Sequence, residues 1–196
     1  MITPTLDILA ATLFDIGAVR FGQFTLHSGR VSPIYLDLRL LVSYPAALRL
    51  ATAAYRERLA GLQFDLLAAF PYAGLPIGTA LCLDMDVPLI YPRKTTKSYG
   101  TGKEIEGKWE VGQTAAVIDD VITSGDSLLQ MIAALKAAGL KVRDALVLVD
   151  REQGGRQLLE AGGYQLHAVL TLRRLLASLE DQGRITPAQR AAVLNR

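Results

Sequence analysis

Two adjacent carboxylates, Asp119 and Asp120, come directly after the apolar run 115–118, and a hydroxyl-rich turn follows them. The turn consists of Val121, Ile122, Thr123, Ser124, Gly125, Asp126 and Ser127. The apolar run predicts a buried strand, and the residues from Ser127 onward predict a helix. A helix N-terminus surrounded by hydroxyls favours a phosphate, because its unpaired N–H groups and its dipole both attract an anion. The two carboxylates suit ribose hydroxyls, or a Mg²⁺ that accompanies a polyphosphate. The alternative is an acidic turn that caps a helix and binds no ligand.

A second candidate site is the polar stretch 93–108, which carries five cations against two carboxylates. Its local charge of +3 exceeds the net charge of +2 for the whole chain. Because Gly100, Gly102 and Gly107 interrupt it, the stretch predicts a mobile lid whose cations can close over an anionic ligand. A solvated surface loop is the alternative.

A third candidate is Arg151, which follows the predicted strand 145–149 and precedes Gly154 and Gly155. Its planar guanidinium can pair with both oxygens of a carboxylate, and the two glycines would let a flat ligand approach the backbone. The alternative is a surface arginine paired with Asp150 or Glu152.

The elements that position these residues alternate between strands and helices from about residue 64 onward, which predicts βαβ units and a parallel sheet. The predicted strands span 64–70, 89–91, 115–118, 145–149 and 166–170, and the predicted helices span 3–18, 45–59, 75–83, 127–138, 155–161 and 172–194, the last as one helix or two. Two short strands within 20–38 are expected outside the main sheet. The 196 residues therefore predict one α/β domain, 1–196. It divides into a small N-terminal hood of about 1–60, a sheet core of about 61–172 and C-terminal helices over 173–196.

Composition excludes several classes of protein. A net charge of +2 does not favour nucleic acid or an acidic membrane as a partner. The single cysteine and two histidines exclude an internal disulfide and a structural zinc site. No apolar run reaches the length of a membrane span, and Asp7 stands where a signal peptide would be apolar, so we expect a cytoplasmic protein. No Walker P-loop or dinucleotide-binding fingerprint occurs.

Four segments together resemble the signature of a known enzyme family: Phe24–Arg39, Arg93–Gly100, Asp119–Ser127 and Asp150–Gly155. The acidic and hydroxyl-rich segment is similar to that of the type I phosphoribosyltransferases, which use phosphoribosyl pyrophosphate. The other three resemble motifs of orotate phosphoribosyltransferase, especially the form fused in UMP synthase. The resemblance implies the type I phosphoribosyltransferase fold, a parallel sheet flanked by helices with a small N-terminal hood.

The resemblance also implies an activity, the Mg²⁺-dependent transfer of phosphoribose from phosphoribosyl pyrophosphate to orotate in pyrimidine biosynthesis. It implies that the catalytic residues are Lys97, Asp119 and Asp120, with the carboxylates facing the ribose and, indirectly, the metal. It places the 5′-phosphate on residues 123–127 and the orotate carboxylate on Arg151, and it makes Val121 and Ile122 substrate-binding as well. The remaining substrate-binding positions are His27, Tyr35, Tyr72, Ala73, Arg93, Lys94 and Tyr99. In the family the lid closes over the active site of the neighbouring subunit, so a homodimer is expected.

The sequence departs from the family pattern at His27, where a lysine is usual, and at Thr95 and Ser98 in the lid. A neutral imidazole cannot replace a permanent ammonium, so His27 either acts when protonated or signals another substrate. Two alternatives therefore remain open at this point. One is a phosphoribosyltransferase for a different base, and the other is a non-catalytic regulatory protein that keeps the nucleotide site.

Overall fold

The computed structural model describes residues 4–25, 29, 31–93 and 104–195. Its helices are α1 (Pro4–Asp15), α2 (Pro45–Leu59), α3 (Gly74–Met85), α4 (Asp126–Ala137), α5 (Gly155–Ala161), α6 (Leu172–Asp181) and α7 (Pro187–Leu194), with a 3₁₀ helix η1 at Leu38–Ser43. Its strands are β1 (Val19–Thr25), β2 (Val31–Leu36), β3 (Leu66–Ala69), β4 (Leu89–Pro92), β5 (Ile105–Glu106), β6 (Thr114–Ile122), β7 (Lys141–Asp150) and β8 (Gln165–Thr171). Within this part of the chain, no helix combines the length and the apolar character that a membrane crossing requires.

Six strands form one sheet in the order β5-β4-β3-β6-β7-β8, parallel except for β5, which runs antiparallel to β4. The predicted α/β fold with a mostly parallel sheet is confirmed. The two-residue strand β5 lies inside the stretch predicted to be irregular. The strand predicted at 115–118 is longer than expected, because β6 continues through Asp119 and Asp120 to Ile122 in register with β7.

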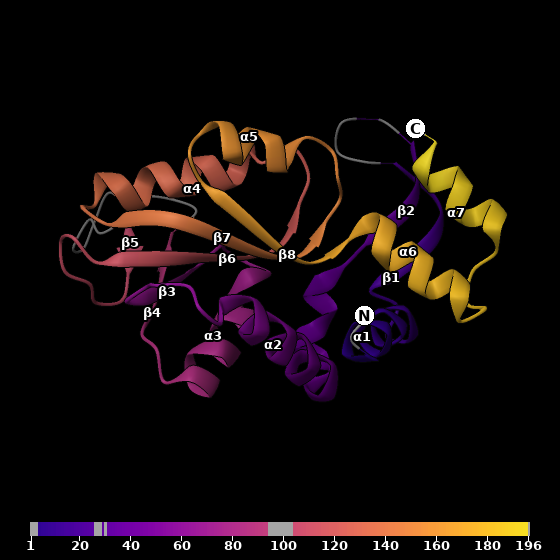
Figure 1. Cartoon of the computed structure of the whole chain (residues 1–196), viewed down its shortest axis with the longest axis horizontal. Coiled ribbons are helices and arrows are strands. Elements are labelled where there is room, and N and C mark those ends of the chain that lie inside the picture. The colour runs from indigo at the N-terminus through magenta and orange to yellow at the C-terminus, as the bar shows by residue number, and fades with distance from the viewer. Residues whose placement is uncertain (1–3, 26–28, 30, 94–103, 196) are drawn as a thin grey trace.

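Helices cover both faces of the sheet, with α4 and α5 on one side and α2 and α3 on the other (Figure 1). Alternate residues of the central strands therefore point into two separate cores. Leu67 and Ile118 pack with α2 and α3, whereas Ala68 and Val117 pack with α4. The near-continuous apolar character of these strands follows from burial on both faces.

The antiparallel ribbon β1–β2 lies outside the main sheet, as predicted, beside α1, α6 and α7 (Figure 1). Asp7 on α1 accepts hydrogen bonds from Ser178 and Arg174 on α6, both at 2.5 Å. The hydrogen bond from Ser178, and then the contact with Arg174, hold the pKa of Asp7 below its usual range although burial opposes this. These contacts join the first helix of the chain to the C-terminal helices.

The predicted division of the chain places helix α2 in the hood of about residues 1–60. This division stays a prediction. In the structure α2 packs on α3 and on the sheet strands β7 and β8.

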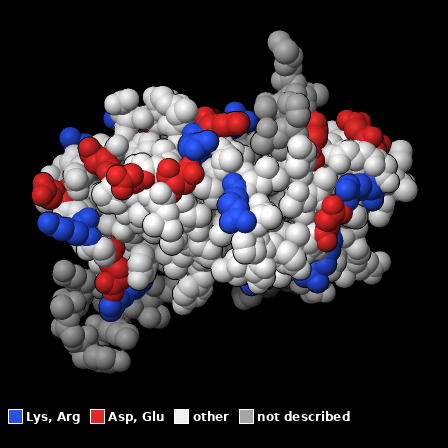
Figure 2. All heavy atoms as spheres, turned by 90° about the horizontal axis from the view of Figure 1, so that it is seen from below, with Lys and Arg blue, Asp and Glu red and all other residues white. Residues whose placement is uncertain are grey.

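The face seen in Figure 2 carries charged side chains of both signs, several of them side by side.

Candidate functional site

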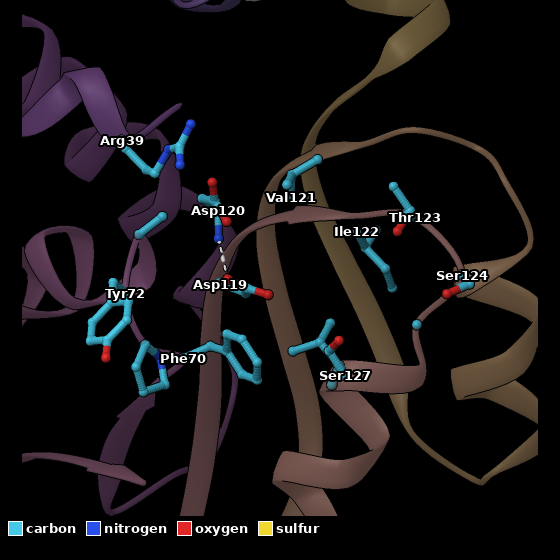
Figure 3. Close-up of a pocket in the computed structure, with 14 residues that line it drawn as sticks. Arg39, Phe70, Tyr72, Asp119, Asp120, Val121, Ile122, Thr123, Ser124 and Ser127 are labelled. Carbon is cyan, nitrogen blue, oxygen red and sulfur yellow. Dashed lines mark hydrogen bonds between the residues drawn. The ribbon is translucent and has the colours of Figure 1, made fainter. Parts of the chain in front are cut away.

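A cavity of about 330 Å³ opens beyond the carboxyl ends of β3 and β6, where ligands bind in open parallel sheets. Figure 3 shows the Thr123–Ser127 turn at one end of it, the two aspartates in the middle, and Tyr72 and Arg39 at the other end. The lining residues are Arg39, Phe70, Pro71, Tyr72, Ala73, Asp119, Asp120, Val121, Ile122, Thr123, Ser124, Gly125, Ser127 and Leu128. Two predicted groups, Tyr72 with Ala73 and the segment 119–125 with Ser127, therefore meet in one place, while Asp126 lies outside the lining.

The turn before α4 leaves the N-terminus of that helix open. Its N-cap is Gly125, in a left-handed conformation (φ 91°), and no side chain of the described residues caps the helix. The Ser124 hydroxyl instead donates to Asp126 at 2.7 Å. The alternative of an acidic turn that merely caps a helix does not describe this geometry. The first N–H groups of α4 remain available to an anion.

The turn owes its shape to a close approach of two glycines. The backbone N–H of Gly155, at the start of α5, donates to the carbonyl of Thr123 at 2.9 Å. A Cβ on Gly125 would lie 3.1 Å from the Gly155 backbone, and a Cβ on Gly155 would lie 2.5 Å from the Thr123 oxygen. Only residues without a side chain let the two loops meet this closely.

The two carboxylates occupy different environments at the end of β6. Asp119 is 6% exposed, and one of its carboxylate oxygens accepts a hydrogen bond from the Asp120 backbone at 2.8 Å (Figure 3). Burial raises the pKa of Asp120, while the Arg39 guanidinium acts in the opposite direction. Below them, the buried Tyr55 hydroxyl of α2 donates to the Asp119 carbonyl at 2.5 Å. Burial raises the pKa of Tyr55, so this phenol stays protonated as a donor.

Arg151 lies just outside the lining of this cavity, directly after β7, with its N–H donating to the Ile122 carbonyl at 3.0 Å. Its side chain forms no ion pair with Asp150 or Glu152, which pair instead with Arg156 and Arg173. The Nε atom is buried and has no hydrogen-bond partner among the described residues, and burial lowers the pKa of the group. The alternative of a surface arginine neutralised by a neighbour therefore does not hold.

The other predicted residues fall into two groups. Tyr35 lies outside the cavity lining and stacks on Phe24, with ring centroids 5.4 Å apart, and Arg93 forms an ion pair with Glu106. His27, Lys94, Lys97 and Tyr99 lie outside the described residues.

Sequence reasoning did not single out Arg39, Phe70, Leu128 or Tyr55. Phe70 ends the predicted strand 64–70, and Leu128 lies in the predicted helix 127–138. Arg39 ends the segment Phe24–Arg39, and its position two residues after Asp37 and four after Tyr35 is the sequence feature that could indicate its contacts. Nothing in the sequence connects Tyr55 with Asp119, because their hydrogen bond spans 64 residues of chain.

The site combines a helix N-terminus without a side-chain cap and two adjacent carboxylates at the carboxyl edge of a parallel sheet. This arrangement is typical of proteins that bind phosphorylated sugars. In agreement, the model of the family described as "Phosphoribosyl transferase domain" matches residues 43–160. The chain is 41% identical to the bifunctional enzyme PyrF/PyrE of Nostoc sp. over 92% of its own length, and it spans 38% of that relative. It is 41% identical to the orotate phosphoribosyltransferase of Pyrobaculum aerophilum, covering 85% of this chain and 87% of the relative.

Among solved structures, the orotate phosphoribosyltransferase of Aeropyrum pernix superposes with a TM-score of 0.80 at 35% identity, over 91% of this chain and 99% of that one. The chain belongs to the orotate phosphoribosyltransferase family.

Proposed function

We propose that this chain transfers a phosphoribosyl group from phosphoribosyl pyrophosphate to a ring nitrogen of orotate. The products are orotidine 5′-phosphate and pyrophosphate, in a step of pyrimidine nucleotide synthesis. The observation that carries the proposal is the open N-terminus of α4 facing the same cavity as Asp119 and Asp120. One end of this cavity suits a phosphate and its middle suits a ribose.

In the proposed reaction the bond between ribose C1 and the diphosphate oxygen breaks, and both electrons leave with the diphosphate. The orotate ring nitrogen bonds to C1, which passes through an oxocarbenium-like state, and the proton of that nitrogen passes to solvent. The protein then needs no covalent nucleophile, because positioning and stabilisation of the departing anion supply the catalysis. Residues 123–127 would hold the 5′-phosphate, and the two aspartates would hold the ribose hydroxyls and stabilise positive charge at the ring.

The donors present fit Mg²⁺, which prefers oxygen ligands and keeps several waters and substrate oxygens. Asp119 and Asp120 are the residues that would hold it, although no cluster of three potential ligands occurs among the described residues. When bound, Mg²⁺ would neutralise charge on the diphosphate.

Arg151 would bind the orotate carboxylate. Its Nε is buried and has no hydrogen-bond partner among the residues that the structure describes. This supports the assignment, because a desolvated guanidinium gains most from an anionic ligand that offers two oxygens. Uracil, adenine and hypoxanthine have no such group.

The resemblance further supports Lys97 as a catalytic residue, with Arg93, Lys94 and Tyr99 at the pyrophosphate end and His27, Tyr35, Tyr72 and Ala73 as further substrate contacts. We propose that Lys97 serves the site of the neighbouring subunit in a homodimer. We keep the cytoplasm as the expected compartment, in which Cys82 would remain the free thiol that the structure shows.

Release of pyrophosphate, measured with orotate, uracil, adenine and hypoxanthine in turn, tests the reaction. Turnover with orotate alone is the expected result. Turnover with another base would favour the alternative substrate that His27 leaves open, and no turnover with any base would favour a regulatory protein.

Mixing the Lys97→Ala and Arg151→Ala proteins tests the shared site, when activity is measured at an orotate concentration far below the raised KM, where each variant alone turns over little. If the two residues serve one site from different subunits, about half of the randomly exchanged dimers contain one intact site, and activity recovers to roughly a quarter of wild type. Subunit exchange is checked by native mass spectrometry of differently tagged chains. Exchange without recovery would show that each lid serves its own subunit.

A further inference from the structure

Arg39 is a charged residue of the cavity lining to which the proposed reaction has so far assigned no role. It lies in η1, outside the main sheet, and its side chain reaches the cavity beside Asp120 (Figure 3). Among the described lining residues it carries the only positive charge, opposite two carboxylates. An anionic substrate that enters between two aspartates therefore meets a compensating charge at this position.

Two neighbours hold the Arg39 guanidinium in a fixed orientation. Its Nε donates to Asp37 Oδ1 at 2.6 Å, and its Nη2 donates to the Tyr35 hydroxyl at 3.0 Å. Tyr35 is itself held, since Phe24 stacks on it and the Arg20 guanidinium carbon lies 5.3 Å from its ring centroid. A guanidinium has five N–H groups, so these two bonds leave three for a ligand. The side chain is 62% exposed and can be reached from the cavity.

The position of Arg39 indicates which part of the substrate it meets. Arg39 lies at the end of the cavity opposite the Thr123–Ser127 turn, on the far side of the aspartates (Figure 3). With the 5′-phosphate in the turn and the ribose on the aspartates, the substituent at ribose C1 extends toward this end. That substituent is the diphosphate before the reaction and the base after it. Arg151, directly after β7, is the residue proposed for the base carboxylate, which leaves the diphosphate for Arg39.

We propose that Arg39 binds the diphosphate of phosphoribosyl pyrophosphate and stabilises the charge that collects on it as the C1–O bond breaks. The inference rests on the proposed function and adds to it a cation that is fixed in place on η1. Arg39 donates hydrogen bonds and transfers no proton. Asp37 and Tyr35 are its positioning residues, because they spare the guanidinium the loss of side-chain freedom on binding.

Calorimetry with two probes separates the diphosphate from the rest of the ligand. Phosphoribosyl pyrophosphate carries the group in question, and ribose 5-phosphate lacks it. Arg39→Gln is expected to lower the affinity for phosphoribosyl pyrophosphate by 10-fold or more, corresponding to about 1.4 kcal/mol. The affinity for ribose 5-phosphate should fall by less than 2-fold. Arg39→Lys keeps the charge without the fork, so it should fall between wild type and Arg39→Gln. Pyrophosphate in the reverse reaction should show a raised KM, with the KM of orotidine 5′-phosphate unchanged.

The matched control is Arg56→Gln, which removes an exposed arginine of α2 that pairs with Asp84 outside the cavity. It should bind both probes as the wild type does. Tyr35→Phe removes one support of Arg39 and keeps its charge, so it should cause a smaller loss that is still confined to the diphosphate probe. This variant keeps the test valid if Arg39→Gln does not fold.

Three results would overturn the inference: equal weakening of both probes, a loss confined to orotate, or no loss at all. A wild-type protein that binds phosphoribosyl pyrophosphate no better than ribose 5-phosphate would refute the proposed function and this inference with it. A wild type that binds both normally and responds to Arg39→Gln, but turns over a base other than orotate, would leave the role of Arg39 intact.

Discussion

The substitution Gly155→Ala tests whether the contact between the two glycine loops shapes the proposed phosphate site. An added Cβ would lie 2.5 Å from the Thr123 oxygen and 2.6 Å from Ile122 Cγ1, whereas real Cβ atoms essentially never approach closer than 3.0 Å. The Thr123 carbonyl must therefore move by about 0.5 Å, a displacement of the size that matters for positioning at a reacting site. It is also the acceptor for the Gly155 N–H, so the same shift weakens that hydrogen bond.

Two effects set the size of the change. Overpacking costs about 1–3 kcal/mol, and the lower chain entropy of unfolded alanine offsets about 0.4–1 kcal/mol of it. We expect the free energy of unfolding to fall by about 1–2 kcal/mol on that balance. A 1 Å misplacement at a reacting site can lower the rate about 100-fold. We expect the smaller displacement here to lower the affinity for ribose 5-phosphate about 10-fold.

Urea unfolding and calorimetry with ribose 5-phosphate measure the two effects separately. Gly163→Ala is the matched control, because Gly163 has a φ of +82° in a turn after α5 and nothing lies within 4 Å of its added Cβ. The control should lose about 1–2 kcal/mol of stability through backbone strain and keep its phosphate affinity. If both variants bind ribose 5-phosphate alike, the reasoning that links the Gly155 contact to the phosphate cradle is wrong.

Three further outcomes are expected. Tyr55→Phe removes the hydrogen bond to the Asp119 carbonyl, so it should lower the free energy of unfolding by about 0.5–1.5 kcal/mol. It should also lower kcat and change KM less, and an unchanged kcat would exclude a positioning role. Asp7, whose pKa the hydrogen bond from Ser178 lowers, stabilises the fold above the unfolded carboxyl pKa of about 3.9 and loses this effect as pH falls through the lower folded value. Asp7→Asn should therefore be less stable than wild type in urea at pH 7, with the difference shrinking toward pH 3, and a constant difference would contradict the linkage. Arg151→Ala should raise the KM of orotate by a factor that corresponds to about 1.5–3 kcal/mol, and unaltered orotate kinetics would remove the substrate assignment.

The parts of the fold that local pattern determines could be predicted from the sequence. Helices α2 and α5 begin and end at the predicted residues, 45–59 and 155–161. Pro45 suits the first turn of α2, and Gly154 is the N-cap of α5. The end of β6 could not be predicted. Two adjacent carboxylates are typical of a loop. In the structure, pairing of Asp119 with Val147 and of Val121 with Val149 extends the strand through them.

The site shows the same limit. That the Thr123–Ser127 turn and the aspartates lie together could be predicted, because they are contiguous in sequence and follow one strand. The contribution of Arg39 depends on a segment outside the sheet lying against the end of β6, and that of Tyr55 on the packing of α2 beneath it. Both are contacts between distant parts of the chain, for which periodicity and spacing carry no information.

The antiparallel pair β4–β5 bears on how sequences with this fold can vary in length. The Arg93 N–H donates to the Glu104 carbonyl at 2.8 Å, and Tyr91 and Pro92 pair with Glu106 and Ile105, so the sheet itself joins the two ends of the segment between them. Each doubling in length of a closed segment costs only about 0.6 kcal/mol. Insertions, deletions or a grafted segment at this place should therefore leave the sheet folded, and selection on the length of the segment would act through binding and turnover.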